Sequence, residues 1–167
     1  MTSPSSESPD LVEIARAVLE GTQASVSGSL VERMEITIDE VTPERIVGSM
    51  PVAGNTQPYG LLHGGASAVL AETLGSIGSA VHGAAIGKLP VGIELSCTHH
   101  RAARGGRVRG TATPLSVGRT LATWQIEIVD DEDRLICTSR LTCMLRDAPL
   151  ATNAAKVPSR RTSHSRQ

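Results

Sequence analysis

One carboxylate lies by itself in a long run of small and apolar residues. Glu72 has no Lys or Arg three or four residues away on either side, so no neighbour on a helix can neutralise it. In an apolar pocket, the loss of water would raise the pKa of this carboxyl group and make it a base or a nucleophile. A glutamate more often lies on a solvated helix face, and the local sequence leaves both interpretations open.

The segment before this run could supply hydrogen-bond donors. His63, Gly64 and Gly65 come at the expected start of a helix, where the first backbone N–H groups have no partner and the helix dipole adds positive potential. Such donors stabilise the oxyanion that forms when a carbonyl group is attacked. Gln57, six residues before His63, carries an amide that could polarise the same carbonyl. The alternative is a tight turn in which His63 is an ordinary loop residue.

The spacing of these groups has a consequence for assembly. Gly64 and Glu72 are eight residues apart, which is about 12 Å along a helix axis. A reacting carbonyl must lie about 3 Å from both its oxyanion donor and its attacking group. We therefore expect Gly64 of one subunit to act with Glu72 of a facing subunit, in a dimer whose central helices are antiparallel. Ser76, one turn after Glu72, could hold the carboxylate or the attacking water.

Two helices are expected to carry this part of the chain. Small and apolar residues predict a central helix over about residues 64–81, with Gly83 and Gly87 at its exit. Apolar residues at helical spacing predict a shorter helix over residues 10–18, with a stop at Gly21.

Alternating apolar and polar residues predict six strands, joined mostly by short turns. They cover residues 35–41, 45–52, 90–100, 107–115, 119–130 and 134–145. Residues 30–34 are expected to form a helical turn before the first strand. In the third strand, Val91, Ile93, Leu95 and Cys97 are expected to share one face. Consecutive strands with short turns favour an antiparallel meander.

This order of elements predicts an α+β fold of one domain, residues 10–148, in which a curved antiparallel sheet wraps the long helix. Such a sheet has free edges, so we expect a homo-oligomer, at least a dimer. Residues 1–9 are rich in Ser and Pro, and residues 149–167 are polar and basic. Both terminal segments are predicted to be disordered.

Composition argues against several classes of function. The formal net charge is −1 and 1% of the residues are aromatic, which disfavours a nucleic acid or an anionic membrane as partner. The sequence has no apolar run of about 18 residues for a membrane span, and its first residues do not resemble a secretion signal. The three cysteines have no metal-like spacing, so we expect no metal site and a reduced, cytoplasmic protein.

The residues singled out above form one combined motif: Gln57, His63, Gly64, Gly65, Glu72 and Ser76. This motif resembles that of the hotdog-fold acyl-CoA thioesterases, and the likeness covers about residues 30–146. It is closest to the aromatic-acyl subgroup, which includes 4-hydroxybenzoyl-CoA thioesterase, 1,4-dihydroxy-2-naphthoyl-CoA hydrolase and the phenylacetate-pathway type. The resemblance implies hydrolysis of an aromatic acyl-CoA, a dimer with a continuous sheet, and a dimer of dimers. CoA would be part of the substrate, and no cofactor is expected.

The resemblance also implies a role for each residue of the motif. Glu72 would be the nucleophile or the general base. Gly64 N–H would bind the thioester oxygen, with help from Gln57. His63 would assist orientation and the departure of the thiolate, and Ser76 would position the hydrolytic water.

The phosphates of CoA need cationic or hydrogen-bonding partners. Two segments match the parts of the family that approach CoA, namely His99, His100 and Arg101 at a strand end, and Ser116, Gly118, Arg119 and Thr120 at a hairpin. The alternatives are a strand end with one ring on each face, and an ordinary surface charge at Arg119. Family members often carry His where Ser116 lies. Nearby Arg104, Arg107 and Arg109 would add positive potential.

Rival functions remain open at this point. A medium-chain acyl group is the alternative to an aromatic one. A thioesterase that clears misloaded acyl carrier protein would have the same motif, and relative rates on carrier-protein and CoA thioesters would separate the two. A protein that binds acyl-CoA without hydrolysing it would release no thiol.

Overall fold

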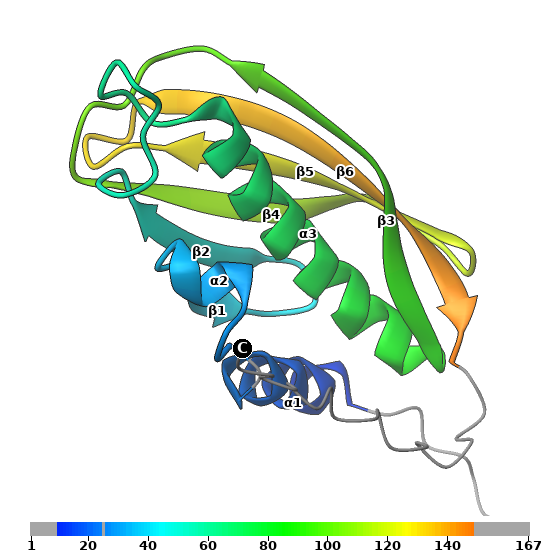
Figure 1. Ribbon diagram of the computed structural model, residues 1–167. Helices are drawn as coiled ribbons and strands as arrows, with labels where there is room; N and C mark the ends of the chain where they lie inside the picture. The colour runs from blue at the N-terminus through cyan, green and yellow to red at the C-terminus, as the bar shows by residue number, and fades with distance from the viewer. Residues whose placement is uncertain (1–9, 25, 149–167) are drawn as a thin grey trace, which may run out of the picture.

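The computed structural model describes residues 10–24 and 26–148, and the segments predicted to be disordered, 1–9 and 149–167, lie outside that range. In the described part, a six-stranded antiparallel sheet curves around one long helix, α3, which covers Gly64–Ala85 (Figure 1). The predicted architecture is therefore confirmed. None of the helices in these residues is both long and apolar enough to cross a lipid bilayer.

The sheet has the strand order β1-β2-β4-β5-β6-β3, and each neighbouring pair is antiparallel. The strands are β1 Thr37–Val41, β2 Ile46–Pro51, β3 Lys88–His99, β4 Arg107–Val117, β5 Leu121–Val129 and β6 Leu135–Asp147. The expected meander holds for β4, β5 and β6. It was wrong for β3, because α3 carries the chain diagonally across the concave face, and β3 begins at the far edge beside β6 (Figure 1).

Two glycines allow α3 to lie close to the sheet. A Cβ at Gly75 would be 2.6 Å from Leu141 Cδ2, and a Cβ at Gly78 would be 2.6 Å from Trp124 Cζ2. Leu141 and Trp124 are fully buried on β6 and β5. Larger residues at the two glycine positions would push the helix off the sheet, because protein interiors are close-packed.

The central helix continues to Ala85, one turn beyond its predicted end at residue 81. Gly83 does not stop it. The missing Cβ of Gly83 leaves room for Lys88 O, which lies 2.7 Å from where that Cβ would be. Gly87 follows the helix end with a φ of 71°, a conformation that glycine adopts readily, and turns the chain into β3.

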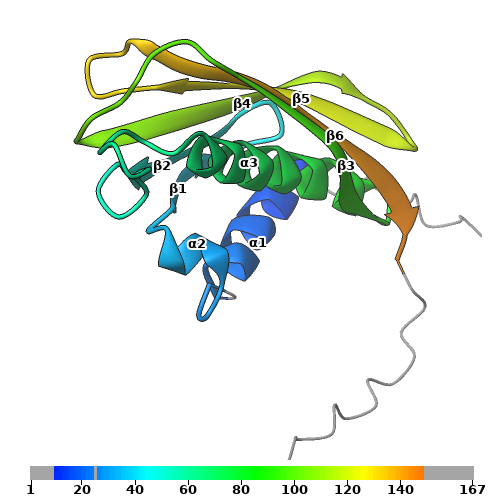
Figure 2. The same cartoon turned by 45° about the horizontal axis from the view of Figure 1, so that its top comes forward.

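Two shorter helices lie beneath α3, on the side away from the sheet (Figure 2). Helix α1 covers Leu11–Ala24 and continues through Gly21, so the predicted stop there was wrong. A glycine in a helix costs about 1 kcal/mol relative to alanine, which does not end a helix that is otherwise packed. Helix α2, Leu30–Arg33, is the predicted helical turn, and Ser29 caps it.

A bulge in β3 decides which of its residues face α3. The register shifts after Gly92, so that Val91 pairs with Met144 whereas Leu95 pairs with Leu141. Leu141 is buried on the inner face of the sheet, and Met144 is exposed on the outer face. Val91 and Leu95 therefore lie on opposite faces, and the predicted common face was wrong. The extra residue of a bulge reverses the alternation of side chains along a strand.

Candidate active site

Glu72 lies half-buried near the middle of α3. Ser76, one turn later, donates a hydrogen bond of 3.5 Å from Oγ to Glu72 Oε1. Burial raises the pKa of the Glu72 carboxyl group above its ordinary value of 4.5, and the hydrogen bond from Ser76 partly opposes that increase. This carboxylate is therefore not on a fully solvated helix face, and its surroundings favour reactivity.

An apolar cavity of about 310 Å³ adjoins the carboxylate. Its lining residues come from α2, α3 and β3, and they are Leu30, Ala68, Val69, Glu72, Thr73 and Leu95. Thr73 uses its hydroxyl hydrogen inside the helix, donating to Val69 O over 2.8 Å. Among these lining residues Glu72 alone is ionisable, so the cavity suits an apolar group held next to one carboxylate.

The start of α3 leaves one backbone donor free. His63 is the N-cap, and its Nδ1 accepts a hydrogen bond of 2.8 Å from Gly65 N–H. Ala66 N–H donates to the carbonyl oxygen of His63, also over 2.8 Å. Within the described residues, Gly64 N–H has no acceptor. It is therefore the donor in this turn that could bind a developing oxyanion.

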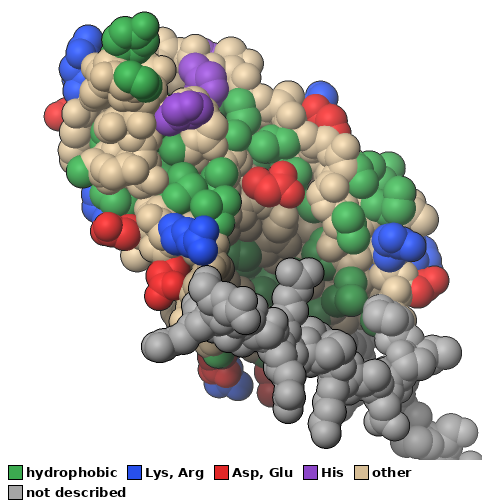
Figure 3. Space-filling model, in the orientation of Figure 1, with side chains coloured by type: hydrophobic (Ala, Val, Ile, Leu, Met, Phe, Trp, Pro, Cys, Tyr) green, Lys and Arg blue, Asp and Glu red, His purple; other side chains and the backbone are tan. Residues whose placement is uncertain are grey.

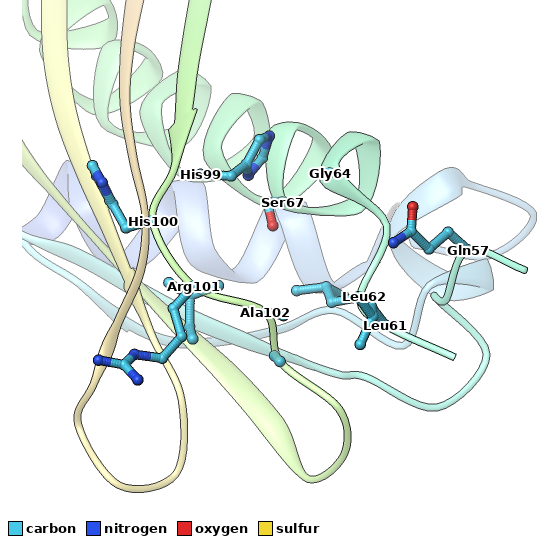
Figure 4. Close-up of a pocket in the computed structure, with 11 residues that line it drawn as sticks. Gln57, Leu61, Leu62, Gly64, Ser67, His99, His100, Arg101 and Ala102 are labelled. Carbon is cyan, nitrogen blue, oxygen red and sulfur yellow. The ribbon is translucent and has the colours of Figure 1, made fainter. Parts of the chain in front are cut away.

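A second cavity, of about 460 Å³, lies at this end of the helix. It brings together Gln57, Gly64, His99, His100 and Arg101, from the loop, the helix and the end of β3 (Figure 4). The His99 ring lies beside the first turn of α3, and a Cβ at Gly64 would be 2.9 Å from its Nε2. The His100 ring points elsewhere, and its Nε2 lies 2.8 Å from Thr138 Oγ1. The predicted donor groups and one of the two predicted CoA segments thus meet in one cavity.

A tight turn holds Gln57 in this cavity. Gln57 N–H donates to Leu61 O over 2.8 Å, and Gly60 N–H donates to Gln57 O over 3.0 Å.

In the space-filling view of this side, histidine side chains gather over the start of α3, and an acidic side chain lies among hydrophobic ones nearer the centre (Figure 3). Histidine and acidic side chains are therefore accessible on the same face of the molecule.

The second predicted CoA segment lies at the other end of the helix. His82, in the last turn of α3, donates from Nε2 to Gly118 O over 2.9 Å, because a carbonyl oxygen can only accept. This contact attaches the β4–β5 hairpin, with Ser116, Arg119 and Thr120, to the end of α3 (Figure 1). His82 is 18 residues after Gly64, which is about 27 Å along the helix. One chain therefore does not bring the two CoA segments together.

The three arginines expected to add positive potential have acidic neighbours. Arg109 forms an ion pair of 2.6 Å with Asp133, and the backbone N–H of Arg107 donates to Asp131. Arg104 lines a polar cavity that also contains Asp130, Asp131 and Glu132. The positive potential expected from these arginines is therefore partly neutralised.

Three residues around Glu72 were not among the predicted site residues. A Cβ at Gly92 would overlap the Glu72 carboxylate, and the negative charge of Glu72 adds to burial in raising the pKa of the Cys143 thiol. Leu30, from α2, forms part of the wall of the apolar cavity. A glycine inside a strand pattern is a signal of close backbone approach, so Gly92 could have been noticed. Nothing local to Leu30 or Cys143 indicates their proximity to the acid.

The fold and the arrangement of the candidate site agree with the family of proteins that this chain resembles. A family model described as the Thioesterase superfamily matches residues 59–137. The chain is 43% identical over 128 residues to the 1,4-dihydroxy-2-naphthoyl-CoA hydrolase of Escherichia coli strain K12, covering 76% of this chain and 93% of that protein. It is 46% identical over 125 residues to the proofreading thioesterase EntH of Cronobacter turicensis, covering 74% of this chain and 90% of the relative.

A solved structure of a thioesterase has a similar fold. The crystal structure of a thioesterase from Haemophilus influenzae superposes with a TM-score of 0.70 at 38% identity, over 77% of this chain and 90% of that one. The resemblance inferred from the motif is therefore confirmed. A curved sheet around one helix, a half-buried acid and relatives of this identity lead to one conclusion: the chain belongs to the thioesterase superfamily, and it is a thioesterase with the hotdog fold.

Proposed function

We propose that this thioesterase hydrolyses an aromatic acyl-CoA to the free acid and CoA, with Glu72 as the catalytic acid–base or nucleophilic group. One observation carries the proposal most directly. The Glu72 carboxylate has a pKa raised by burial and forms part of the wall of an apolar cavity of about 310 Å³. An acyl group in that cavity would bring its thioester carbon next to the carboxylate.

The site would be completed by a second subunit. In this chain Gly64 and Glu72 line two separate cavities, so one substrate carbonyl does not meet both. Strand β3 is an edge strand, and its Leu89, Val91 and Ile93 are each about half exposed. Antiparallel pairing of two β3 edges would satisfy the free backbone groups of this strand and set two α3 helices side by side in opposite directions. The Gly64 end of one helix would then approach Glu72 of the other.

The same pairing would assemble the CoA site. In one chain, residues 99–101 and 116–120 lie at opposite ends of α3. A two-fold axis between antiparallel helices brings the end of one helix next to the start of the other, and so unites the two segments. His99, Arg101 and Arg119 would then hold the phosphates and the pantetheine, with Ser116, Gly118 and Thr120 shaping the hairpin.

We further propose that two dimers associate through the outer face of the sheet. Val91, Met144 and Leu121 are consecutive partners across β3, β6 and β5, and each is between 42% and 47% exposed. A row of apolar side chains of this kind favours packing against a second sheet. Light scattering at several concentrations would measure the assembly.

Hydrolysis would proceed by one of two routes that use the same groups. As a base, Glu72 takes a proton from a water held by Ser76, and that water forms the new C–O bond. As a nucleophile, Glu72 attacks the carbonyl carbon itself, and water later cleaves the resulting anhydride. In both routes Gly64 N–H and Gln57 bind the negative oxygen, the C–S bond breaks, and the CoA thiolate leaves and takes up a proton.

The other groups have supporting roles in this proposal. His63 orients the start of α3 through its contact with Gly65, and its imidazole assists the departing thiolate. Apart from the CoA within the substrate, we propose no cofactor, because a base, an oxyanion donor and water complete the reaction. Location in the cytoplasm stays a prediction from the sequence.

The test is thiol release from a panel of thioesters. Benzoyl-CoA, 4-hydroxybenzoyl-CoA, hexanoyl-CoA and decanoyl-CoA would be compared at equal concentration with the purified protein. We expect the aromatic substrates to have the higher kcat/KM. Tight binding of all four acyl-CoAs with no thiol release would contradict hydrolysis and favour a protein that only binds acyl-CoA.

A second candidate is proofreading of acyl carrier proteins, favoured by the 46% identity to a relative named a proofreading thioesterase. The same benzoyl group, loaded on an aryl or acyl carrier protein, separates the two functions. A kcat/KM on the loaded carrier protein above that on benzoyl-CoA would favour proofreading.

A further inference from the structure

We propose that Gly92, on the edge strand β3, is a positioning residue for the Glu72 carboxylate. Because Gly92 has no Cβ, the Glu72 carboxylate can occupy the space beside its Cα. The proposal rests on the catalytic function proposed for Glu72, and it adds a residue that none of the motif positions includes.

The contact leaves no room for a Cβ at position 92 while the Glu72 carboxylate keeps its position. A Cβ at position 92 would lie 2.3 Å from Glu72 Oε1 and 3.3 Å from Glu72 Cδ, whereas Cβ atoms in proteins essentially never approach within 3.0 Å. A side chain at position 92 would therefore force the carboxylate to move. Glu72 carries the catalytic carboxylate in this proposal, so the displaced atoms are the reacting ones.

Backbone conformation does not explain why the residue at position 92 is a glycine. The glycines with a positive φ in the described residues are Gly28, Gly54, Gly60, Gly87 and Gly106, and Gly92 is not among them. Alanine could therefore adopt the backbone angles found at position 92. What position 92 requires is empty space, and Glu72 is the residue that fills it.

The carboxylate is held from two directions at once. Oε1 faces Gly92 on the strand side, and it accepts the 3.5 Å hydrogen bond from Ser76 on the helix side. Cys143, the register partner of Gly92 on β6, is a titratable group whose thiol the charge of Glu72 influences. Pushing the carboxylate off Gly92 would alter its distance to Ser76 and turn it toward solvent.

The bulge places Gly92 for this role. The ladder between β3 and β6 loses its regular register between Gly92 and Glu94. Bulges often lie next to active sites, where they redirect part of the strand. Here the irregularity occurs at the point where the helical carboxylate meets the strand.

The first test is Gly92→Ala, with Gly105→Ala as matched control. A Cβ at Gly105 would meet no atom within 4 Å, and its φ is not positive, so that substitution adds the same methyl group in open space. We expect Gly92→Ala to lower kcat by about a hundredfold, the cost of displacing a catalytic group by about 1 Å, with KM little changed. The acid limb of its pH profile should move to lower pH, because the displaced carboxylate is more solvated. Gly105→Ala should keep normal kinetics.

A double-mutant cycle separates the carboxylate contact from a general effect on the strand. Aspartate is shorter by one methylene, so Glu72→Asp leaves room for a Cβ at position 92. We expect Gly92→Ala to slow the wild-type protein about tenfold more than it slows the Glu72→Asp variant. Equal effects of Gly92→Ala in the two backgrounds would overturn the proposal.

Thermal unfolding provides a readout that does not depend on activity. Gly92→Ala should change the Tm of the wild-type protein more than that of the Glu72→Ala variant, in which no carboxylate meets the added methyl group. The same change of Tm in both backgrounds would show that the strand, and not the contact, requires glycine. Full turnover by Glu72→Gln would instead contradict the proposed function of Glu72. The comparison of Tm values in the two backgrounds would still decide whether Gly92 positions the side chain of Glu72.

Discussion

His63 Nδ1 accepts a hydrogen bond of 2.8 Å from the backbone N–H of Gly65, and this contact closes the first turn of α3. A histidine is an unusual N-cap, since Ser, Thr, Asp and Asn are the common ones. The contact takes up Gly65 N–H, whereas Gly64, which lines the cavity with Gln57 and His99, keeps its N–H without an acceptor among the described residues. His63 therefore decides which amide remains available.

Replacement of His63 tests the role of this cap. His63→Ala should destabilise the protein by about 1 kcal/mol, because a capping acceptor is lost, whereas His63→Asn should restore most of that stability. We expect kcat of His63→Asn to exceed that of His63→Ala by about tenfold, since the cap orients Gly64 N–H. Equally low kcat in both variants, with stability restored only in the Asn variant, would assign the imidazole a chemical role in thiolate departure.

Removal of the acid tests the centre of the site. Glu72→Gln keeps the size of the side chain but removes the base and nucleophile, so kcat should fall by about a thousandfold or more. Acyl-CoA binding and the assembly state should be unchanged, as measured by equilibrium dialysis and light scattering. Near-normal thiol release by the purified variant would contradict the role given to Glu72.

The raised pKa of Glu72 predicts how activity depends on pH. The carboxylate must be ionised to act, so kcat/KM should increase with pH through the pKa of Glu72, with a midpoint above 4.5. Cys143 also titrates nearby, but burial raises the pKa of its thiol, so it does not ionise on the acid limb. A profile in a series of buffers at constant ionic strength would measure the midpoint, and a midpoint at or below 4.5 would be the contrary result.

The same pKa predicts the pH dependence of stability. In the folded protein the neutral carboxyl group is favoured over the charged one, so the pKa is higher than in the unfolded chain. Stability is therefore lost as pH rises from the unfolded pKa through the folded pKa, and it is then constant with respect to this group. Glu72→Gln lacks this loss and should be more stable than wild type at pH 7. Denaturant unfolding at pH 4 and pH 7 should show that the advantage grows with pH.

Mixed dimers test whether two subunits share each site. Proline is tolerated at the first helical position but has no N–H, so Gly64→Pro removes the oxyanion donor, and its added atoms also displace the His99 ring of the same subunit. In a mixture with Glu72→Ala, each mixed dimer would contain one intact site and one site with both defects. Random exchange should therefore restore about a quarter of wild-type activity. No recovery, after subunit exchange has been confirmed with labelled chains, would argue against a shared site.

The wall of the apolar cavity should set the preference for acyl size. Leu30 is 53% exposed and lines this cavity, so Leu30→Trp should narrow it without overpacking the core. We expect kcat/KM for benzoyl-CoA to fall about tenfold while that for acetyl-CoA changes little, because the smaller acyl group does not reach the wall. Val12→Trp, on α1 at 68% exposure, is the matched control. An equal fall for both substrates would place the acyl group elsewhere.

Much of this protein can be predicted from its sequence because the relevant signals are local. Small and apolar residues around Glu72 predicted the long helix, and alternation predicted all six strands. The absence of a basic residue near Glu72 identified a candidate acid, and the motif from Gln57 to Gly65 identified the family. Each of these signals depends on residues within one or two turns, so no knowledge of the tertiary structure was needed.

Other features were decided by contacts between distant parts of the chain. The pairing of β3 with β6 and the bulge after Gly92 depend on register across strands that are far apart in sequence, so alternation alone placed Val91 on the wrong face. Only the packed structure brings Leu30 and Gly92 to Glu72 and separates residues 99–101 from the hairpin near His82. Local periodicity determines which elements form, whereas the close packing of one element on another determines which side chains meet.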